Sequence, residues 1–377
     1  MEKRRQKHLA SLTFILIAAM LPIVGSHTQA GKYYYISIAV AGILFIPFLL
    51  IRLRIADLSR EYGNVFEYLS ETNGFLGRRF AGIYATYALT TAITSLRTIG
   101  EEIKLTSLFN TPLIVLFLFM SVLYLYILRK GYRVIGHFSA LYVPLFVVGI
   151  IGYVLLSVSR YEFGNFEPID ISAIKNISIS TGESITGFFG DAVLILFISG
   201  MNNKKEKTEP LRKRYFIFAY GGAFFCILVT VLNSMLVIGG EALNKLYFPH
   251  YITVSLINFG FVARLETVVD ILYFIALNIK IAFSLYCAAK GFGYRFGRIK
   301  LLVSYTKYIN IGIYLACAVI AAFAFQSVRK FFVYIEFYRY GGPFMLLILL
   351  GLWITTEIVA RRGRIKRLKE GKLASAG

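Results

Sequence analysis

Long apolar runs recur along this chain, and they constrain its fold more than any other feature. Two examples are TPLIVLFLFMSVLYLYILRK, residues 111–130, and RYGGPFMLLILLGLWITTEIVA, residues 339–360. An α-helix needs about 20 predominantly apolar residues to cross a bilayer. Hydrophobic residues make up 57% of the chain and charged residues only 16%, whereas soluble domains carry about 25% charged residues. The sequence therefore predicts an all-α membrane protein with several transmembrane helices.

The apolar runs predict ten transmembrane helices in two sets of five. The spans are expected near residues 8–28, 33–52, 80–106, 112–128, 134–157, 183–200, 215–238, 263–289, 301–324 and 341–360. The first set covers about 8–157, the second covers about 183–360, and a basic tail follows over 361–377. Because no connection has room for a soluble domain, we expect one integral membrane domain over 1–377.

The net charge of +21 raises the question of a nucleic-acid partner, but the placement of the basic residues favours a bilayer instead. Lys and Arg are concentrated in both tails and in alternate connections, at 52–79, 129–133, 204–214 and 290–300. Cytoplasmic segments of membrane proteins carry such an excess of basic residues. We therefore expect a multi-pass protein with both termini in the cytoplasm and no nucleic-acid partner.

Catalytic and cofactor-binding motifs are missing from the sequence. It contains no GKS or GKT phosphate-binding loop, no HExxH and no CxxC, and its four histidines are scattered through tails and span ends. These motifs are the usual signs of nucleotide, zinc or redox chemistry. We therefore predict a protein that is not an enzyme and has neither a cofactor nor a bound metal.

Helix-breaking residues occur at matching positions of the two halves. The first span contains Pro22 and Gly25, and the sixth contains Gly187 and Gly190. Spans 1 and 6 each open one half of a five-plus-five arrangement. Interrupted helices in corresponding positions point to a midplane binding site in inverted-repeat transporters. Glycine and proline are also common in ordinary membrane helices, so simple helix packing is the alternative.

Several motifs are distributed along the whole chain. The most specific is Arg-x-Glu at Arg264 and Glu266, preceded by a segment that runs from Pro249 to Ser255. Supporting motifs are VFEYLSETNGFLG at 65–77, LRTIGEEIKLTSLFNTPLIV at 96–115 and LRKGYRVIGHFSALYVPLF at 128–146. Together these motifs resemble the B subunit of spore germinant receptors, the GerAB-type family. The pattern departs from the family at position 197, where Phe stands in place of a proline, and Pro22 precedes Gly25 rather than following it.

This resemblance implies a fold and a function. The family belongs to the amino acid–polyamine–organocation group, whose members have a LeuT-like 5+5 inverted repeat with broken helices 1 and 6. It implies a subunit in the inner membrane of a bacterial spore that binds a small nutrient, often an amino acid. Its partners would be a membrane A subunit and a lipoprotein C subunit. A secondary transporter of amino acids or polyamines is one alternative, and a membrane scaffold with a vestigial pocket is another.

An amino-acid ligand would need partners for both of its charges. Unwound backbone in spans 1 and 6 offers N–H groups for a carboxylate and carbonyls for an ammonium. Phe188 and Phe189 could close over an apolar side chain, although a tight helix contact would explain the same GFFG sequence. Asp191 is the acid that the resemblance places in span 6. In span 3, Thr91 is a candidate pocket residue, unless its hydroxyl only bonds its own backbone.

Lys280 lies in the middle of the eighth span, where a lysine costs about 2.5–3.5 kcal/mol on insertion scales. Asp270 is ten residues away on the same helix, about 15 Å at 1.5 Å per residue, so it cannot pair with Lys280 directly. Three interpretations remain open. Lys280 could snorkel to the interface, form an ion pair with Asp191, or supply a fixed charge where sodium-coupled relatives bind a cation.

Arg264 and Glu266 open the eighth span. Because they are two residues apart, they point to different faces of a helix. We expect them to hold neighbouring elements together or to gate access of a ligand.

Overall fold

The computed structural model consists of helices and their connections in the part of the chain that it describes. It describes all residues except 1, 24, 27, 61, 73, 167, 169, 199–210, 258–264, 297–305 and 375–377. The helices of the first half are α1 (Glu2–Ala18), α2 (Tyr34–Leu58), α3 (Val65–Thr72), α4 (Gly74–Thr106), α5 (Leu113–Lys130) and α6 (Tyr132–Ser157). Those of the second half are α7 (Ile174–Ser184), α8 (Lys213–Ile238), α9 (Gly240–Lys245), α10 (Pro249–Ser255), α11 (Leu265–Phe296), α13 (Thr306–Phe323) and α14 (Val328–Ala374).

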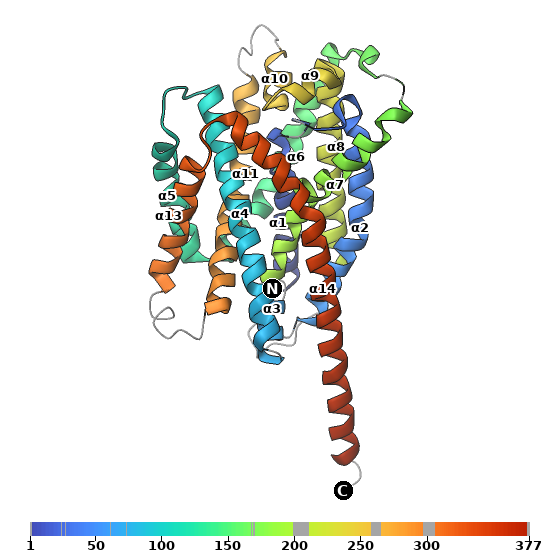
Figure 1. Cartoon of the computed structure of the whole chain (residues 1–377), viewed down its shortest axis with the longest axis vertical. Coiled ribbons are helices and arrows are strands. Elements are labelled where there is room, and N and C mark those ends of the chain that lie inside the picture. The colour runs from blue at the N-terminus through green and yellow to red at the C-terminus, as the bar shows by residue number, and fades with distance from the viewer. Residues whose placement is uncertain are drawn as a thin grey trace.

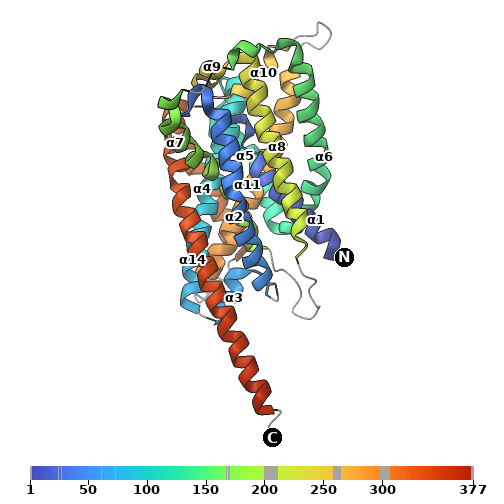
Figure 2. The same ribbon diagram turned by 90° about the vertical axis from the view of Figure 1, so that its right-hand side faces the viewer.

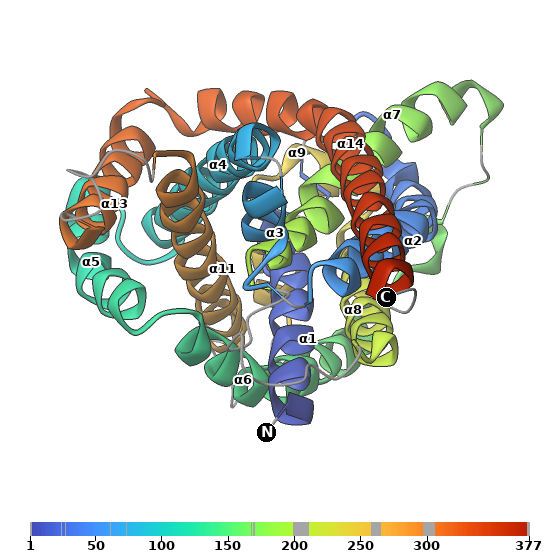
Figure 3. The same cartoon turned by 90° about the horizontal axis from the view of Figure 1, so that it is seen from below.

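The long helices run side by side in one bundle. The short helices α9 and α10 cover one end, and α3 lies at the other (Figure 1). The C-terminal part of α14 extends beyond the α3 end (Figure 2). Seen from that end, α1 runs from the rim of the bundle toward its middle, between α11 and α8, while α5 and α13 lie at one side (Figure 3). The span that contains α1 is 83% buried, against 22% for α5, so α1 belongs to the core of the bundle.

Length and apolarity identify seven described helices that can cross a membrane, or eight if a bent pair counts as one span. The bent pair joins Asn310–Phe323 to Val328–Glu336 at an angle of 113°. The two other predicted spans correspond to α4 and to the segment that begins with α7. α4 carries Arg97, Glu101 and Glu102 near one end, and the second segment is not one continuous helix.

The sixth span changes helix type twice. After α7, residues Ile185–Phe189 form a π-helix and Gly190–Phe197 form a 3₁₀ helix. Runs of 3₁₀ helix longer than three or four residues are uncommon, and π-turns often mark functional sites. The predicted interruption of span 6 is therefore present, and it covers Gly187 and Gly190.

The first span is also interrupted, but earlier than Pro22 and Gly25 suggested. α1 ends at Ala18, a 3₁₀ turn follows over Leu21–Ile23, and Gly25 adopts a left-handed φ of +86°. In a continued α-helix, the ring of Pro22 would clash with the carbonyl four residues earlier, which is that of Ala18. Beyond Ala18, the chain therefore forms this 3₁₀ turn rather than a continued α-helix.

A buried arginine ties α4 to the end of α13. Arg97 donates from Nη1 to the carbonyls of Ala321 and Ala322, at 2.8 and 3.0 Å. Its other terminal nitrogen forms an ion pair with Glu101, one turn further along α4. Both charged side chains are almost completely buried. Arg97 thus supplies donors to the last carbonyls of a helix, which otherwise lack intrahelical partners.

Candidate binding site

A buried ion pair lies where the sixth span leaves π-helical geometry. Asp191 is the second residue of the 3₁₀ segment, and its Oδ2 lies 2.5 Å from Nζ of Lys280 on α11. The side chain of Lys280 is 0% exposed and that of Asp191 is 3% exposed. Each charge therefore depends on the other for compensation, because water does not reach either one. Of the three interpretations of Lys280, the structure contains the ion pair with Asp191.

Hydroxyl groups hold the other oxygen of the Asp191 carboxylate. Tyr87 and Thr91, one turn apart on α4, donate to Oδ1 at 2.8 and 3.0 Å. The hydroxyl of Tyr338 on α14 lies 2.9 Å from that of Thr91. Because Thr91 gives its only proton to Asp191, Tyr338 must donate to Thr91. The network thus joins four elements: α4, the 3₁₀ segment, α11 and α14.

Side chains from neighbouring helices donate hydrogen bonds to backbone carbonyls of the 3₁₀ segment. Arg52 of α2 donates to the carbonyl of Ala192 at 2.6 Å. From α11, the thiol of Cys287 donates to Leu194 and Lys290 donates to Phe197, at 3.6 and 3.4 Å. These bonds satisfy backbone groups that regular α-helical hydrogen bonds would otherwise take, and so help to stabilise the unusual helix type.

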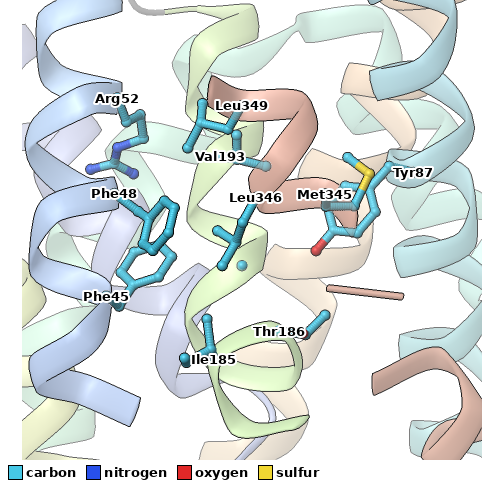
Figure 4. Close-up of a pocket in the computed structure, with 11 residues that line it drawn as sticks. Phe45, Phe48, Arg52, Tyr87, Ile185, Thr186, Val193, Met345, Leu346 and Leu349 are labelled. Atoms are coloured by element: carbon cyan, nitrogen blue, oxygen red, sulfur yellow. The ribbon is translucent and has the colours of Figure 1, made fainter. Parts of the chain in front are cut away.

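A small pocket adjoins this network. Figure 4 shows it between α2, α4, the sixth span and α14. The lining residues are mostly apolar: Phe45, Phe48, Arg52, Tyr87, Ile185, Thr186, Gly190, Val193, Met345, Leu346 and Leu349. Its cavity volume is about 10 Å³, roughly the space needed for one water molecule. An amino acid would fit only after the surrounding helices move apart.

Residues 6–327 match a family model described as spore germination protein. The chain belongs to this family. Spore germination protein KB of Bacillus subtilis is 26% identical over 236 residues, which cover 60% of this chain and 61% of that protein. The chain therefore spans about three fifths of the length of this relative. The putative spore germination protein YfkT of Bacillus subtilis is 21% identical over 290 residues, 77% of each chain.

The fold of this spore germination family member is similar to that of a solved transporter. A manganese transporter of Eremococcus coleocola, solved as a mutant, superimposes with a TM-score of 0.50 at 14% sequence identity. The superposition covers 93% of this chain and 78% of the transporter. This likeness concerns the fold alone, and it confirms the predicted all-α membrane fold of the LeuT-like class. The family and the apolar helices together identify a multi-pass membrane protein.

The structure brings several predicted site residues to one place. Thr91, Asp191 and Lys280 meet in the network, and Gly190 lines the adjacent pocket. Phe189 stacks on Phe45 with ring centroids 5.7 Å apart. Phe188 and Gly187 are buried in the π-helix. The neighbouring hydroxyls of Thr90 and Thr94 on α4 instead donate to backbone carbonyls of their own helix, at Tyr87 and Thr90.

Other predicted site residues make contacts outside this network. The carbonyl of Pro22 lies 2.9 Å from Nδ1 of His250, and Gly25 packs against Leu243. Arg264 lies outside the described residues. Glu266 is half-buried in the first turn of α11.

Sequence reasoning missed Tyr87, Tyr338 and Arg52. Tyr87 lies four residues before Thr91, so the helical spacing already placed both on one face. Tyr338 lies on α14, which begins at Val328. The predicted tenth span began only near residue 341 and so did not include Tyr338. Arg52 stands at the end of the second apolar run, where its charge resembled an ordinary span boundary.

The hydroxyl of Tyr87 provides a direct test of the network. Tyr87→Phe is expected to lower the free energy of unfolding by about 1.5–3 kcal/mol, because it removes a hydrogen bond to a charged, buried carboxylate. Tyr84→Phe is the matched control, since the Tyr84 hydroxyl is buried one turn away without a hydrogen-bond partner among the described residues. Unfolding of the detergent-purified protein measures both. Equal effects of the two changes would contradict the assignment.

Proposed function

We propose that this chain is the ligand-sensing membrane subunit of a spore germinant receptor. Its ligand would be a small nutrient such as an amino acid, bound at the Asp191–Lys280 pair. The family match supports the role in germination. The observation that carries the ligand class is the ion pair itself, which sits beside a pocket at a break in helix geometry.

An amino acid carries the two charges that Asp191 and Lys280 need as partners once they separate. Its ammonium would take the place of Lys280 beside Asp191, and its carboxylate would bind the released Nζ. Every buried charge then stays compensated, whereas a ligand with only one charge would leave Asp191 or Lys280 unpaired. Truncating one partner of a buried charge pair at an interface costs about 2–5 kcal/mol or more. The site therefore favours zwitterions.

Signalling would follow from the space that the ligand needs. A pocket of about 10 Å³ must widen to accept an amino acid, so the ligand binds an open arrangement better than the closed one. Such a difference in affinity is what shifts a conformational equilibrium. In this proposal, the open arrangement is recognised by the membrane A subunit and the lipoprotein C subunit. The chain would lie in the spore inner membrane with both termini in the cytoplasm.

Liposomes that contain the purified protein test this proposal. A labelled amino-acid panel should show saturable binding without uptake, and Lys280→Ala should abolish the binding. Two analogues of the amino acid that binds are then compared with it: the amine that lacks its carboxylate and the acid that lacks its ammonium. Each analogue should bind at least about 30-fold more weakly than the amino acid. Uptake driven by a proton or sodium gradient would identify a transporter instead.

Germination assays distinguish a ligand-sensing subunit from a membrane scaffold with a vestigial pocket. A sensing subunit should lose its response when the pocket is filled by Gly190→Leu, because a side chain there meets Tyr87 Oη within 3.2 Å of its Cβ. A normal germination response in this variant, with the protein present at wild-type levels, would contradict ligand binding at this pocket.

A further inference from the structure

A second group of buried ionisable side chains lies at the α10 end of the bundle. Glu102 comes from the end of α4, His250 is the second residue of α10, and Asp270 lies in the second turn of α11. Their side chains are 6%, 1% and 19% exposed. None of them takes part in the Asp191–Lys280 network.

The protonation of His250 follows from its contacts. Nδ1 lies 2.9 Å from the carbonyl of Pro22, and a carbonyl can only accept, so Nδ1 carries a proton. The other ring nitrogen, Nε2, faces the two carboxylates and lies 3.3 Å from Glu102 Oε1 and 3.4 Å from Asp270 Oδ1. Charge-assisted N–H···O hydrogen bonds are usually about 2.7–2.9 Å long. Among the described residues, none of these three atoms has a hydrogen-bond partner.

The three atoms are spaced as metal ligands are. All lie within 4.8 Å of one another. Neighbouring ligand atoms around a tetrahedral ion bonded at 2.0–2.1 Å are separated by about 3.3–3.4 Å, which matches both distances from Nε2. A histidine that binds a metal through one nitrogen almost always donates from the other to a carbonyl, carboxylate or water. The Nδ1–Pro22 contact has this arrangement.

The charges of the cluster also favour a cation. When ionised, the two carboxylates of Glu102 and Asp270 carry a formal charge of −2, and a single imidazole can offset at most one unit of it. A divalent ion bound to a neutral imidazole and both carboxylates gives a net charge of zero.

We propose that Glu102, His250 and Asp270 bind one divalent transition-metal ion, with Zn²⁺ as the best representative. The mixed nitrogen and oxygen ligands select this class, because Ca²⁺ and Mg²⁺ prefer oxygen ligands alone. Three protein ligands leave a position for water. The ion fastens α4, α10 and α11 together and, through His250, holds the interrupted end of the first span at Pro22.

Zn²⁺ binding to the full chain tests this site. The protein is purified in detergent without a histidine tag, stripped with EDTA and titrated with Zn²⁺ against a fluorescent chelator. His8 and His137 form a separate pair with ring centroids 4.6 Å apart, so all measurements use a His8→Ala background. We expect one Zn²⁺ per chain, and an affinity at least about 100-fold weaker in Glu102→Gln and in Asp270→Asn.

The control and the contrary result are equally specific. Glu241→Gln removes an exposed carboxylate of α9 and should leave the Zn²⁺ affinity unchanged. Thermal unfolding without metal establishes that the variants are folded, and Zn²⁺ should raise the melting temperature of the parent protein but not that of folded Asp270→Asn. The absence of stoichiometric Zn²⁺ binding, or Zn²⁺ binding that survives both ligand changes, would overturn the proposal.

Discussion

Replacing Lys280 with methionine is expected to lower the free energy of unfolding by about 3–5 kcal/mol, the usual effect of removing one partner of a buried ion pair. Methionine fills a similar volume, so the loss arises from the charge of Asp191, which remains buried beside Tyr87 and Thr91. Chemical or thermal unfolding in detergent measures the change. Lys245→Met is the control, because that side chain is 78% exposed.

A double-mutant cycle separates the pair from its surroundings. Asp191→Leu alone should be similarly destabilising, since it leaves the ammonium of Lys280 without its carboxylate. Replacing both residues by apolar ones is often neutral or stabilising in proteins, so the double variant should be more stable than either single variant. Additive losses would mean that the two charges are not coupled.

Arg97→Leu is expected to be destabilising to a similar extent, about 3–5 kcal/mol. The change leaves Glu101 buried without its cation, and it removes the donor to the carbonyls of Ala321 and Ala322. Arg97→Lys should restore only part of the stability, because an ammonium does not reproduce the planar fork of a guanidinium.

The matched control for Arg97 is a more exposed arginine that also joins two helices. Arg54 of α2 binds Glu357 of α14 at 2.8 Å, with the arginine side chain 42% exposed. Exposed pairs contribute about 0–1 kcal/mol, so Arg54→Leu should change stability little. If both arginine variants unfold alike, burial does not set the strength of these contacts.

The parts of the fold that depend on hydrophobicity were predictable from the sequence. Apolar runs located the long helices, and glycine and proline indicated that both spans are interrupted, although the first helix already ends at Ala18. The exact helix types were not predictable, because Arg52, Cys287 and Lys290 stabilise the 3₁₀ segment from helices that are distant in sequence. Such contacts exist only once the bundle has formed.

Charged residues of the site were easier to recognise than neutral ones. Asp191 and Lys280 stand out because a charge inside an apolar run is costly. Tyr87 and Tyr338 do not, since the chain contains 26 tyrosines and any of them can face a neighbouring helix. Glu102, His250 and Asp270 lie near the ends of helices, where ionisable residues are common, and only the fold shows that their side chains converge.

The closed pocket has a consequence for the dose of nutrient that the proposed receptor would detect. If only a fraction of molecules is open, the apparent dissociation constant exceeds the intrinsic one by the inverse of that fraction. A population of about 1% open would shift the half-maximal concentration roughly 100-fold upward. The tight packing of Phe45, Met345 and Leu346 around about 10 Å³ would thus set a concentration threshold, so that a spore ignores traces of nutrient too small to support growth.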